Sequence, residues 1–156
     1  MRVMTLLIIH QSPKVLLAMK KRGFGIGRWN GFGGKVKEGE TIEETMHREL
    51  MEESGGLTVP NLEKRALFRF HFPHNPEIDC ETHVFLATEF VGEPQETEEM
   101  QPQWFDESEI PFDQMWSDDR LWLPLFLAGK KLKGNFIFDG QDKIVEHSLD
   151  EVEEII

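Results

Sequence analysis

Apolar residues near the start of this chain come in two short runs separated by a turn. Residues 3–10 (VMTLLIIH) and 14–20 (KVLLAMK) have the length and aliphatic content of buried strands. The Gln-Ser-Pro sequence between them predicts a tight turn. Residues 23–39 contain seven glycines and are therefore predicted to be mostly loop.

The spacing of apolar residues changes to that of a helix over residues 41–54. Thr41 is expected as the N-cap, and Glu44, three residues later, completes a capping box. The Gly55-Gly56 pair is expected to end the helix.

The rest of the chain alternates between strand-like and helix-like segments. Strands are predicted near 64–72 and 82–90 and at 101–106, a second helix at 118–129, and a final hairpin at 134–139 and 143–149 turned by Asp139-Gly140. Most of these strands can pair antiparallel, so we expect an α/β fold with a mixed sheet and helices on both faces. With no linker or repeat, residues 1–156 are expected to form a single domain.

The charge of the chain is strongly negative and unevenly distributed. The formal net charge is −12, with 17 basic and 29 acidic residues. Residues 1–39 carry eight basic groups and one acid (+7), which leaves 9 minus 28, or −19, for the remainder. Stable binding to nucleic acid is therefore not expected. An anionic small ligand fits the first region and divalent cations fit the second, although an unevenly charged surface is equally compatible.

A cellular location follows only loosely from the sequence. No apolar run is long enough for a membrane span, so no membrane association is expected. The N-terminus lacks the features of a secretory signal, and the single cysteine, Cys80, excludes an internal disulfide. We expect a cytoplasmic protein, with the nucleus and mitochondria left open.

Two common phosphate-binding motifs do not fit the glycine-rich segment. Around Gly34-Lys35 a P-loop would need glycine at Trp29 and a hydroxyl residue at Val36. Gly23, Gly25 and Gly27 are spaced by two and do not open a helix, which excludes a dinucleotide fingerprint.

Carboxylates interrupt the apolar face of the first helix. On a helical projection Glu53 falls within the stripe formed by Ile42, Met46 and Leu50, Glu49 falls at its edge, and Glu52 lies farther to the same side. Buried carboxylates are costly unless they are paired or bind metal. The cluster suits Mg²⁺, with Mn²⁺ as a second candidate, whereas a Glu-rich solvated helix is the alternative interpretation.

The spacing around this helix resembles a known signature. Gly34, five residues, Glu40, seven residues and then RELMEESG at 48–55 match the Nudix box, Gly-x5-Glu-x7-Arg-Glu-U-x-Glu-Glu-x-Gly-U, where U is aliphatic. The last position falls on Gly56, with the aliphatic Leu57 one residue later. We interpret this as a one-residue insertion that loosens the helix exit without disturbing the ligands.

Sequence outside the box narrows the resemblance to one branch of the Nudix family. The segments MKKRGFG, WNGFGGK, Glu98-Glu99-Met100 and Asp118-Asp119 are similar to the animal MutT homologues, which are oxidised purine nucleoside triphosphate diphosphatases. The resemblance implies an α/β/α sandwich around a mixed central sheet. It also implies hydrolysis of oxidised purine nucleoside triphosphates (8-oxo-dGTP and 2-hydroxy-dATP types, with methylated purines also open) to monophosphate and diphosphate, which sanitises the nucleotide pool.

The resemblance also assigns roles around the metal. Glu49, Glu52 and Glu53 match metal-binding positions, helped by the backbone of Gly33 and Gly34. Glu99 matches a further carboxylate, either a metal ligand or the general base, and it competes with Glu53 for the second role. Arg48 is expected to orient the glutamates by ion pairing, with Glu40 among its partners; a surface arginine is the alternative.

A second set of residues is expected to bind the substrate. The resemblance places near the base, sugar or polar rim Thr5, Lys20, Phe24, Asn30, Phe70, Phe72, Met100, Trp116, Asp118, Asp119 and Trp122. The aromatic residues could equally be ordinary core, and Asp118-Asp119 could be a helix N-cap. Two carboxyl groups in an apolar pocket should not both ionise, so one can donate and the other accept a hydrogen bond from a purine edge.

Other functions remain as alternatives. A Nudix hydrolase of dinucleotide polyphosphates or nucleotide sugars would share the box, and a nucleotide-binding module without catalysis would be expected to lack one of its glutamates. His71, His74, Cys80 and His83 form too loose a set to predict zinc. We expect a monomer that acts on a small nucleotide.

Overall fold

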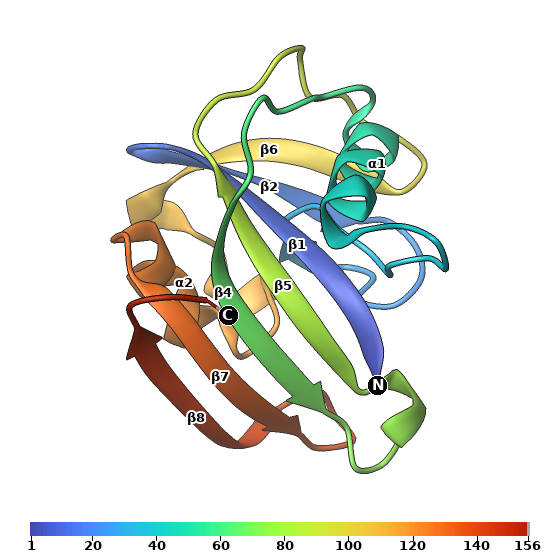
Figure 1. Cartoon of the computed structure of the whole chain (residues 1–156), viewed down its shortest axis with the longest axis vertical. Helices are drawn as coiled ribbons and strands as arrows, with labels where there is room; N and C mark the ends of the chain where they lie inside the picture. Colours follow the sequence, from blue (N-terminus) through green and yellow to red (C-terminus); the bar gives the residue numbers. More distant parts are fainter. Residues whose placement is uncertain (156) are drawn as a thin grey trace.

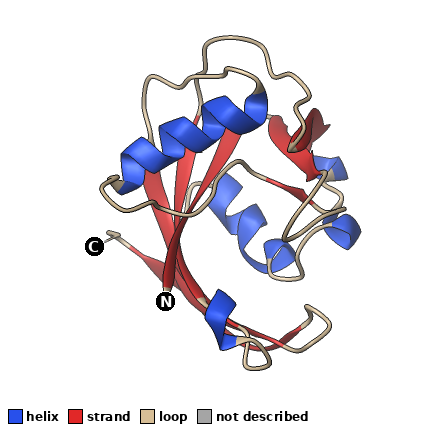
Figure 2. Ribbon diagram, turned by 90° about the vertical axis from the view of Figure 1, so that its right-hand side faces the viewer, coloured by secondary structure: helices blue, strands red, loops and turns tan. Residues whose placement is uncertain are grey.

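A single mixed sheet organises the chain, and two α-helices pack on its opposite faces (Figures 1 and 2). The computed structural model describes residues 1–155. The strands are β1 (Arg2–Gln11), β2 (Lys14–Lys20), β3 (Trp29–Asn30), β4 (Glu63–His71), β5 (Cys80–Ala87), β6 (Met100–Asp106), β7 (Lys131–Phe138) and β8 (Ile144–Val152). Their order is β3-β2-β1-β5-β4-β7-β8, with β6 also paired to β2. The pairs β1–β5 and β4–β7 are parallel and the others are antiparallel, which confirms the mixed sheet.

Alternation along β1 divides the core into two layers. Leu7 and Ile9 are buried with Met46 and Leu50 of α1 (Ile42–Ser54) on one side of the sheet. Ile8 points to the other side, where residues of α2 (Asp119–Leu127) complete a second cluster. Figure 2 shows α1 along one face of the curved sheet and α2 on the other side. The predicted α/β/α layering is therefore confirmed.

Local signals at both ends of α1 act as the sequence predicts. The Thr41 side chain accepts a hydrogen bond from the backbone N–H of Glu44, and the Glu44 side chain accepts one from Thr41 N–H. At the other end Gly55 adopts the left-handed conformation, with φ of 77°, and closes the last turn. Gly56 N–H donates to Met51 O, so the extra glycine does not loosen the helix exit.

The bounds of one strand, of the final hairpin and of the second helix differ from the prediction, and strand pairing explains the first two. The strand expected at 82–90 spans 80–87, since its parallel ladder with β1 runs from Arg2↔Cys80 to Ile9↔Ala87. The final hairpin is longer at both ends, because β4 pairs with β7 from Leu132 onward. The helix expected at 118–129 is shorter, at Asp119–Leu127, and the Asp118 side chain makes no capping hydrogen bond.

A divergence of β1 and β2 creates the space for the site. The two strands pair only from Ile9↔Leu16 to Gln11↔Lys14, near their shared turn. Toward the N-terminus of β1, the glycine-rich segment lies beside the strand in place of β2, with the bridges Leu7↔Phe32 and Met4↔Lys35. The backbone of residues 31–35 is thereby held against β1, between the two separating strands.

Candidate active site

Two adjacent glycines bring the backbone of the loop against β1 and against α1. A side chain on Gly33 would place its Cβ 1.9 Å from Thr5 O, and one on Gly34 would place it 2.5 Å from the Glu49 carboxylate. Thr5 N–H donates to Gly34 O at 2.8 Å. A side chain at position 33 would clash with the backbone of β1, and one at position 34 would displace the Glu49 carboxylate, so both positions favour glycine. The loop that carries them leads into α1 (Ile42–Ser54), which we call the acidic helix.

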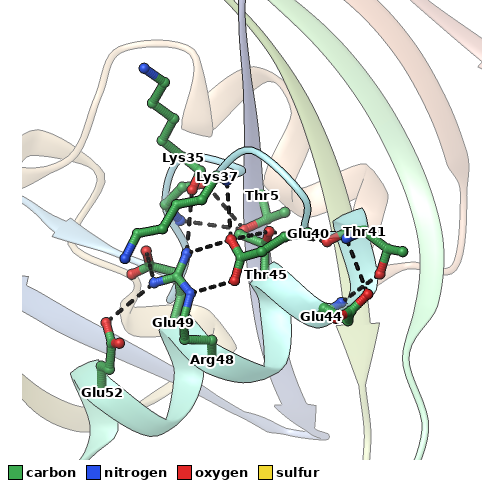
Figure 3. A network of polar contacts seen from close by, with 11 residues as sticks. Thr5, Lys35, Lys37, Glu40, Thr41, Glu44, Thr45, Arg48, Glu49 and Glu52 are labelled. Carbon is green, nitrogen blue, oxygen red and sulfur yellow. Dashed lines mark hydrogen bonds and ion pairs between the residues drawn. The ribbon is translucent and has the colours of Figure 1, made fainter.

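Arg48 connects three glutamates on one side of this helix (Figure 3). Its Nε is 2.7 Å and its Nη2 2.9 Å from the two carboxylate oxygens of Glu40. Its Nη1 is 2.9 Å from Glu49 Oε1 and 3.4 Å from Glu52 Oε2. The guanidinium lowers the pKa of Glu40 to about 2. The structure thus bears out the pairing of Arg48 with Glu40, because a planar fork can bind several carboxylates at once.

Glu53 is the most deeply buried carboxylate of the acidic helix. It is 4% exposed, and its Oε1 accepts a hydrogen bond from Gly33 N–H at 2.8 Å. Burial raises the pKa of Glu53 to about 8, opposed by this hydrogen bond and increased by the Glu49 charge. Burial also raises the pKa of Glu49, although its ion pair with Arg48 opposes the shift.

The remaining acidic residues lie farther from this pair. Glu52 has a side chain 57% exposed and reaches only Arg48, so the three glutamates expected as one cluster are not assembled together. Glu99 pairs with Arg22, which lowers the pKa of the Glu99 carboxyl. Its loop is tied to α1 because Thr97 Oγ1 donates to Glu53 O at 3.2 Å. Within residues 1–155, no three His, Cys, Asp or Glu side chains form a complete metal site.

The donor set nevertheless fits a hard divalent cation. Glu53 and Glu49 bring carboxylate oxygens to the adjacent glycines Gly33 and Gly34, and the charge of Glu49 disfavours ionisation of Glu53. A cation that accepts oxygen ligands would relieve both the repulsion and the cost of burial. Among the protein's own residues, Lys20 is the cation whose charge lowers the pKa of both Glu49 and Glu53.

A cavity extends from Glu53 between β1, the glycine-rich segment and the start of α2. The expected residues that line it are Thr5, Lys20, Phe24, Asn30, Gly33, Gly34, Glu53, Phe70, Phe72, Met100, Trp116, Asp118 and Asp119. Its aromatic walls contact one another: the rings of Phe24 and Trp116 lie 5.1 Å apart, and those of Phe72 and Phe138 stack at 5.1 Å. One cavity thus links the buried carboxylate of the acidic helix to the aromatic residues.

Two adjacent acidic residues of the cavity lining are buried. Asp118 and Asp119 are 3% and 4% exposed. Asp118 Oδ2 accepts a hydrogen bond from Trp122 Nε1 at 2.7 Å, whereas Asp119 Oδ2 is buried with no partner. Burial raises the pKa of Asp118 to about 6, and burial together with the Asp118 charge raises the pKa of Asp119 further. The unmatched oxygen fits a polar group of a ligand.

Trp122 is placed differently from the expectation. It is 1% exposed, packs against Phe68 and Phe126, and does not line the cavity. It therefore acts on the pocket only by holding Asp118. Its position one helical turn after Asp118 explains this contact, since residues i and i+4 share a helix face.

Several lining residues lie outside the sequence prediction. They are Arg2, Met4, Leu6, Gly25, Arg28, Gly31, Cys80, Thr82 and Phe138. Arg2 and Cys80 meet because they are directly paired across β1 and β5. The register of parallel strands that are distant in sequence carries no local signal, whereas the alternation Arg2-Met4-Leu6 could have indicated one shared face.

Comparison with known proteins assigns the chain to a family. The model of the NUDIX domain matches residues 1–126. The chain belongs to the Nudix family. Two curated Nudix relatives carry the description "oxidized purine nucleoside triphosphate hydrolase". The relative from Danio rerio is 54% identical over 154 residues, which are 99% of this chain and 97% of that protein. The one from Mus musculus is 53% identical over 152 residues, or 97% and 96%.

Solved Nudix structures share the fold. A MutT protein from Bacillus halodurans superposes with a TM-score of 0.82 and 28% identity, and the match covers 96% of this chain and 98% of that one.

No helix within residues 1–155 is long and apolar enough to span a membrane.

Proposed function

We propose that this Nudix chain hydrolyses oxidised purine nucleoside triphosphates, of the 8-oxo-dGTP and 2-hydroxy-dATP types, to monophosphate and diphosphate. The observation that carries the proposal is the cavity itself, which is lined both by Glu53 of the acidic helix and by Asp118 and Asp119. Relatives with more than half of their residues identical carry the same activity in their description. The cellular role of such an enzyme is to remove damaged precursors from the nucleotide pool.

The acidic pair supports recognition of an altered purine edge. Two buried neighbouring carboxyl groups favour sharing one proton, so the pair presents both a donor and an acceptor. Asp119 Oδ2 is the atom without a partner in the protein. The flat faces of Trp116 and Phe72 are suited to contact the rings of the base, and Asn30 adds an amide at the same cavity.

The part of the cavity beside Glu53 is suited to the phosphate chain. Lys20 lies near the carboxylates and brings a positive charge to it. Glu49 and Glu53, with Glu52 and Glu99 as further candidate ligands, would hold Mg²⁺ or Mn²⁺ near the backbone of Gly33 and Gly34. When bound, such an ion neutralises the triphosphate and makes its phosphorus more electrophilic.

Glu53 is the better candidate for the proton acceptor. It lines the cavity and is held in place by Gly33 N–H, and the nearby charge of Lys20 favours the ionised form that can accept a proton. Glu99 is fixed in an ion pair with Arg22, and its pKa is lowered. Arg48 acts indirectly, by holding Glu49 and Glu52 in position.

We further propose that the enzyme acts as a monomer in the cytoplasm, with the nucleotide pools of the nucleus or mitochondria as further sites of action.

Turnover of a substrate panel tests this function. The purified protein with Mg²⁺ should hydrolyse 8-oxo-dGTP or 2-hydroxy-dATP with a kcat/KM at least 10-fold above that for dGTP. Diadenosine polyphosphates and a nucleotide sugar complete the panel. Preference for either of the last two substrates, or no discrimination against dGTP, would overturn the proposal.

A further inference from the structure

The indole of Trp116 is the meeting point of three segments that are distant in sequence. The guanidinium carbon of Arg28, from the glycine-rich segment, lies 4.2 Å from the centroid of the Trp116 ring. Arg28 Nη2 is also 3.2 Å from Asp142 Oδ2, which belongs to the turn between β7 and β8. A cation over the face of tryptophan is attracted by the π-electrons, and Asp142 fixes where that cation sits.

The turn that carries Asp142 is itself fastened to the neighbour of Trp116. Ser117 Oγ accepts a hydrogen bond from Ile144 N–H at 3.1 Å and lies 3.5 Å from Asp142 O, to which it donates. Asp142 has a φ of 61°, a left-handed conformation that Asp and Asn adopt more readily than other side chains. The turn therefore has a fixed shape, and it holds the Asp142 carboxylate toward Arg28.

Other aromatic rings also contact Trp116. The buried rings of Phe72 and Phe138 meet it edge-on at 6.3 and 5.6 Å, and the Phe24 ring is tilted by 35°. A Cβ on Gly25 would lie 3.3 Å from Trp116 Nε1, so the loop passes close to the indole. Phe24 is 53% exposed and lies between two glycines with positive φ, so it is held less firmly than the buried rings. Arg28 is the residue of this loop that contacts the indole and is also held from outside the loop, by Asp142.

We propose that Arg28, held by Asp142, is a positioning residue that orients Trp116 as a wall of the base pocket and so sets the affinity for the purine. This inference rests on the proposed function for its substrate. Without Arg28 the indole loses an attractive partner, and the flat surface is no longer prepared before the base arrives. The carboxylates of the acidic helix are unaffected, so the cost should fall on binding rather than on turnover.

Kinetics and nucleoside binding separate this role from a simple charge effect. Arg28→Met should raise KM for 8-oxo-dGTP by about 3- to 30-fold, with kcat within about twofold of wild type. Binding of 8-oxo-2′-deoxyguanosine, which has no phosphates, should weaken by the same factor in calorimetry. Asp142→Asn, which keeps the turn conformation, should shift both in the same direction by less. Arg69→Met is the matched control, because Arg69 makes only a surface ion pair with Glu81.

Arg28→Lys distinguishes stacking from charge. If the planar guanidinium orients Trp116, lysine should restore little of the nucleoside affinity. The proposal is overturned if Arg28→Met leaves nucleoside binding unchanged, or if Arg28→Lys fully restores KM for the triphosphate.

A readout without any ligand keeps the inference separate from the substrate assignment. The four tryptophans can be labelled with 5-fluorotryptophan, and the Trp116 signal is identified by its loss in Trp116→Phe. Arg28→Met should shift or broaden the Trp116 fluorine resonance, whereas Arg69→Met should not. An unchanged Trp116 resonance contradicts the positioning role, whichever nucleotide the enzyme uses. Failure of wild type to bind or hydrolyse oxidised purines contradicts the proposed function alone.

Discussion

Glu53 combines two properties that rarely coexist in one carboxyl group. It is almost fully buried, and the atom that contacts it is a backbone N–H rather than a cationic side chain. A group in this state is poised to accept a proton or a cation, because either one removes the cost of burying its charge. Its value to the enzyme therefore lies in chemistry more than in stability.

Replacement of Glu53 by glutamine tests that view. Glu53→Gln keeps the size of the side chain and an oxygen for Gly33 N–H, so the fold and Tm should be retained. Activity should fall by about 10²-fold or more, as expected for loss of a positioned base or ligand. Wild-type protein in EDTA should lose activity to a similar degree. Near-native turnover by a folded Glu53→Gln variant would contradict the catalytic role of Glu53. Near-native turnover of wild type in EDTA would contradict the need for a divalent metal.

The acidic pair makes a prediction about stability and pH. Asp118 has a pKa of about 6 in the folded chain, above the ordinary value of 3.8, so folding is favoured most when the group is protonated. This contribution is complete below pH 3.8 and is lost as pH rises through about 6.

Urea unfolding at several pH values checks the sign. Relative to the Asp118→Asn/Asp119→Asn double variant, wild type without ligand should lose at least about 2 kcal/mol of unfolding free energy between about pH 4 and pH 6, because the pKa of Asp119 is raised as well. A difference that does not vary with pH would show that the pair is not buried and shared in this way.

At the scale of elements, the acidic helix and its glycines were the most predictable part of the molecule. The capping box, the glycine stop and the pairing of Arg48 with Glu40 depend on residues close in sequence, where spacing fixes geometry. The positions of Cys80 and Arg2 at the cavity, and of Arg28 over Trp116, depend on strand register and loop packing, which local patterns do not encode. Trp122 was misplaced because an aromatic residue on an apolar helix face is compatible with core and pocket alike.

The contacts of Arg48 with Glu40, Glu49 and Glu52 predict the effect of replacing Arg48. Arg48→Lys keeps the charge but cannot bind Glu40 and Glu49 at the same time with a planar fork. Glu49 should lose its fixed position, and kcat should fall by about 10-fold or more. His47→Ala, one residue away and without a hydrogen-bond role in the network, serves as the control. Equal activity of Arg48→Lys and wild type would mean that the network only stabilises the helix.

At the scale of the whole molecule, the proposed function places the base beside Asp118 and Asp119 and the phosphates beside Glu53 in one cavity. A substrate anchored at both ends presents one particular phosphorus to the attacking water. From the resemblance to the Nudix family we expect attack at the β-phosphorus. Attack at the α- or the β-phosphorus gives the same two products, so the position of the new oxygen distinguishes them. In ¹⁸O-labelled water the label should appear in the diphosphate. Label in the monophosphate alone would place the attack at the α-phosphorus.

The most direct test of the account is the substrate preference of Asp119→Asn. The amide keeps the shape of the carboxyl group but fixes one donor and one acceptor, so it can no longer change its hydrogen-bonding pattern with the base. The measurement is kcat/KM for 8-oxo-dGTP and 2-hydroxy-dATP across pH, for wild type and Asp119→Asn. If the acidic pair reads the base edge, the ratio between the two substrates should change by roughly 5- to 150-fold, as for one unmatched polar group. If Asp119→Asn keeps the wild-type ratio at every pH, the pair does not recognise the base and the central claim is wrong.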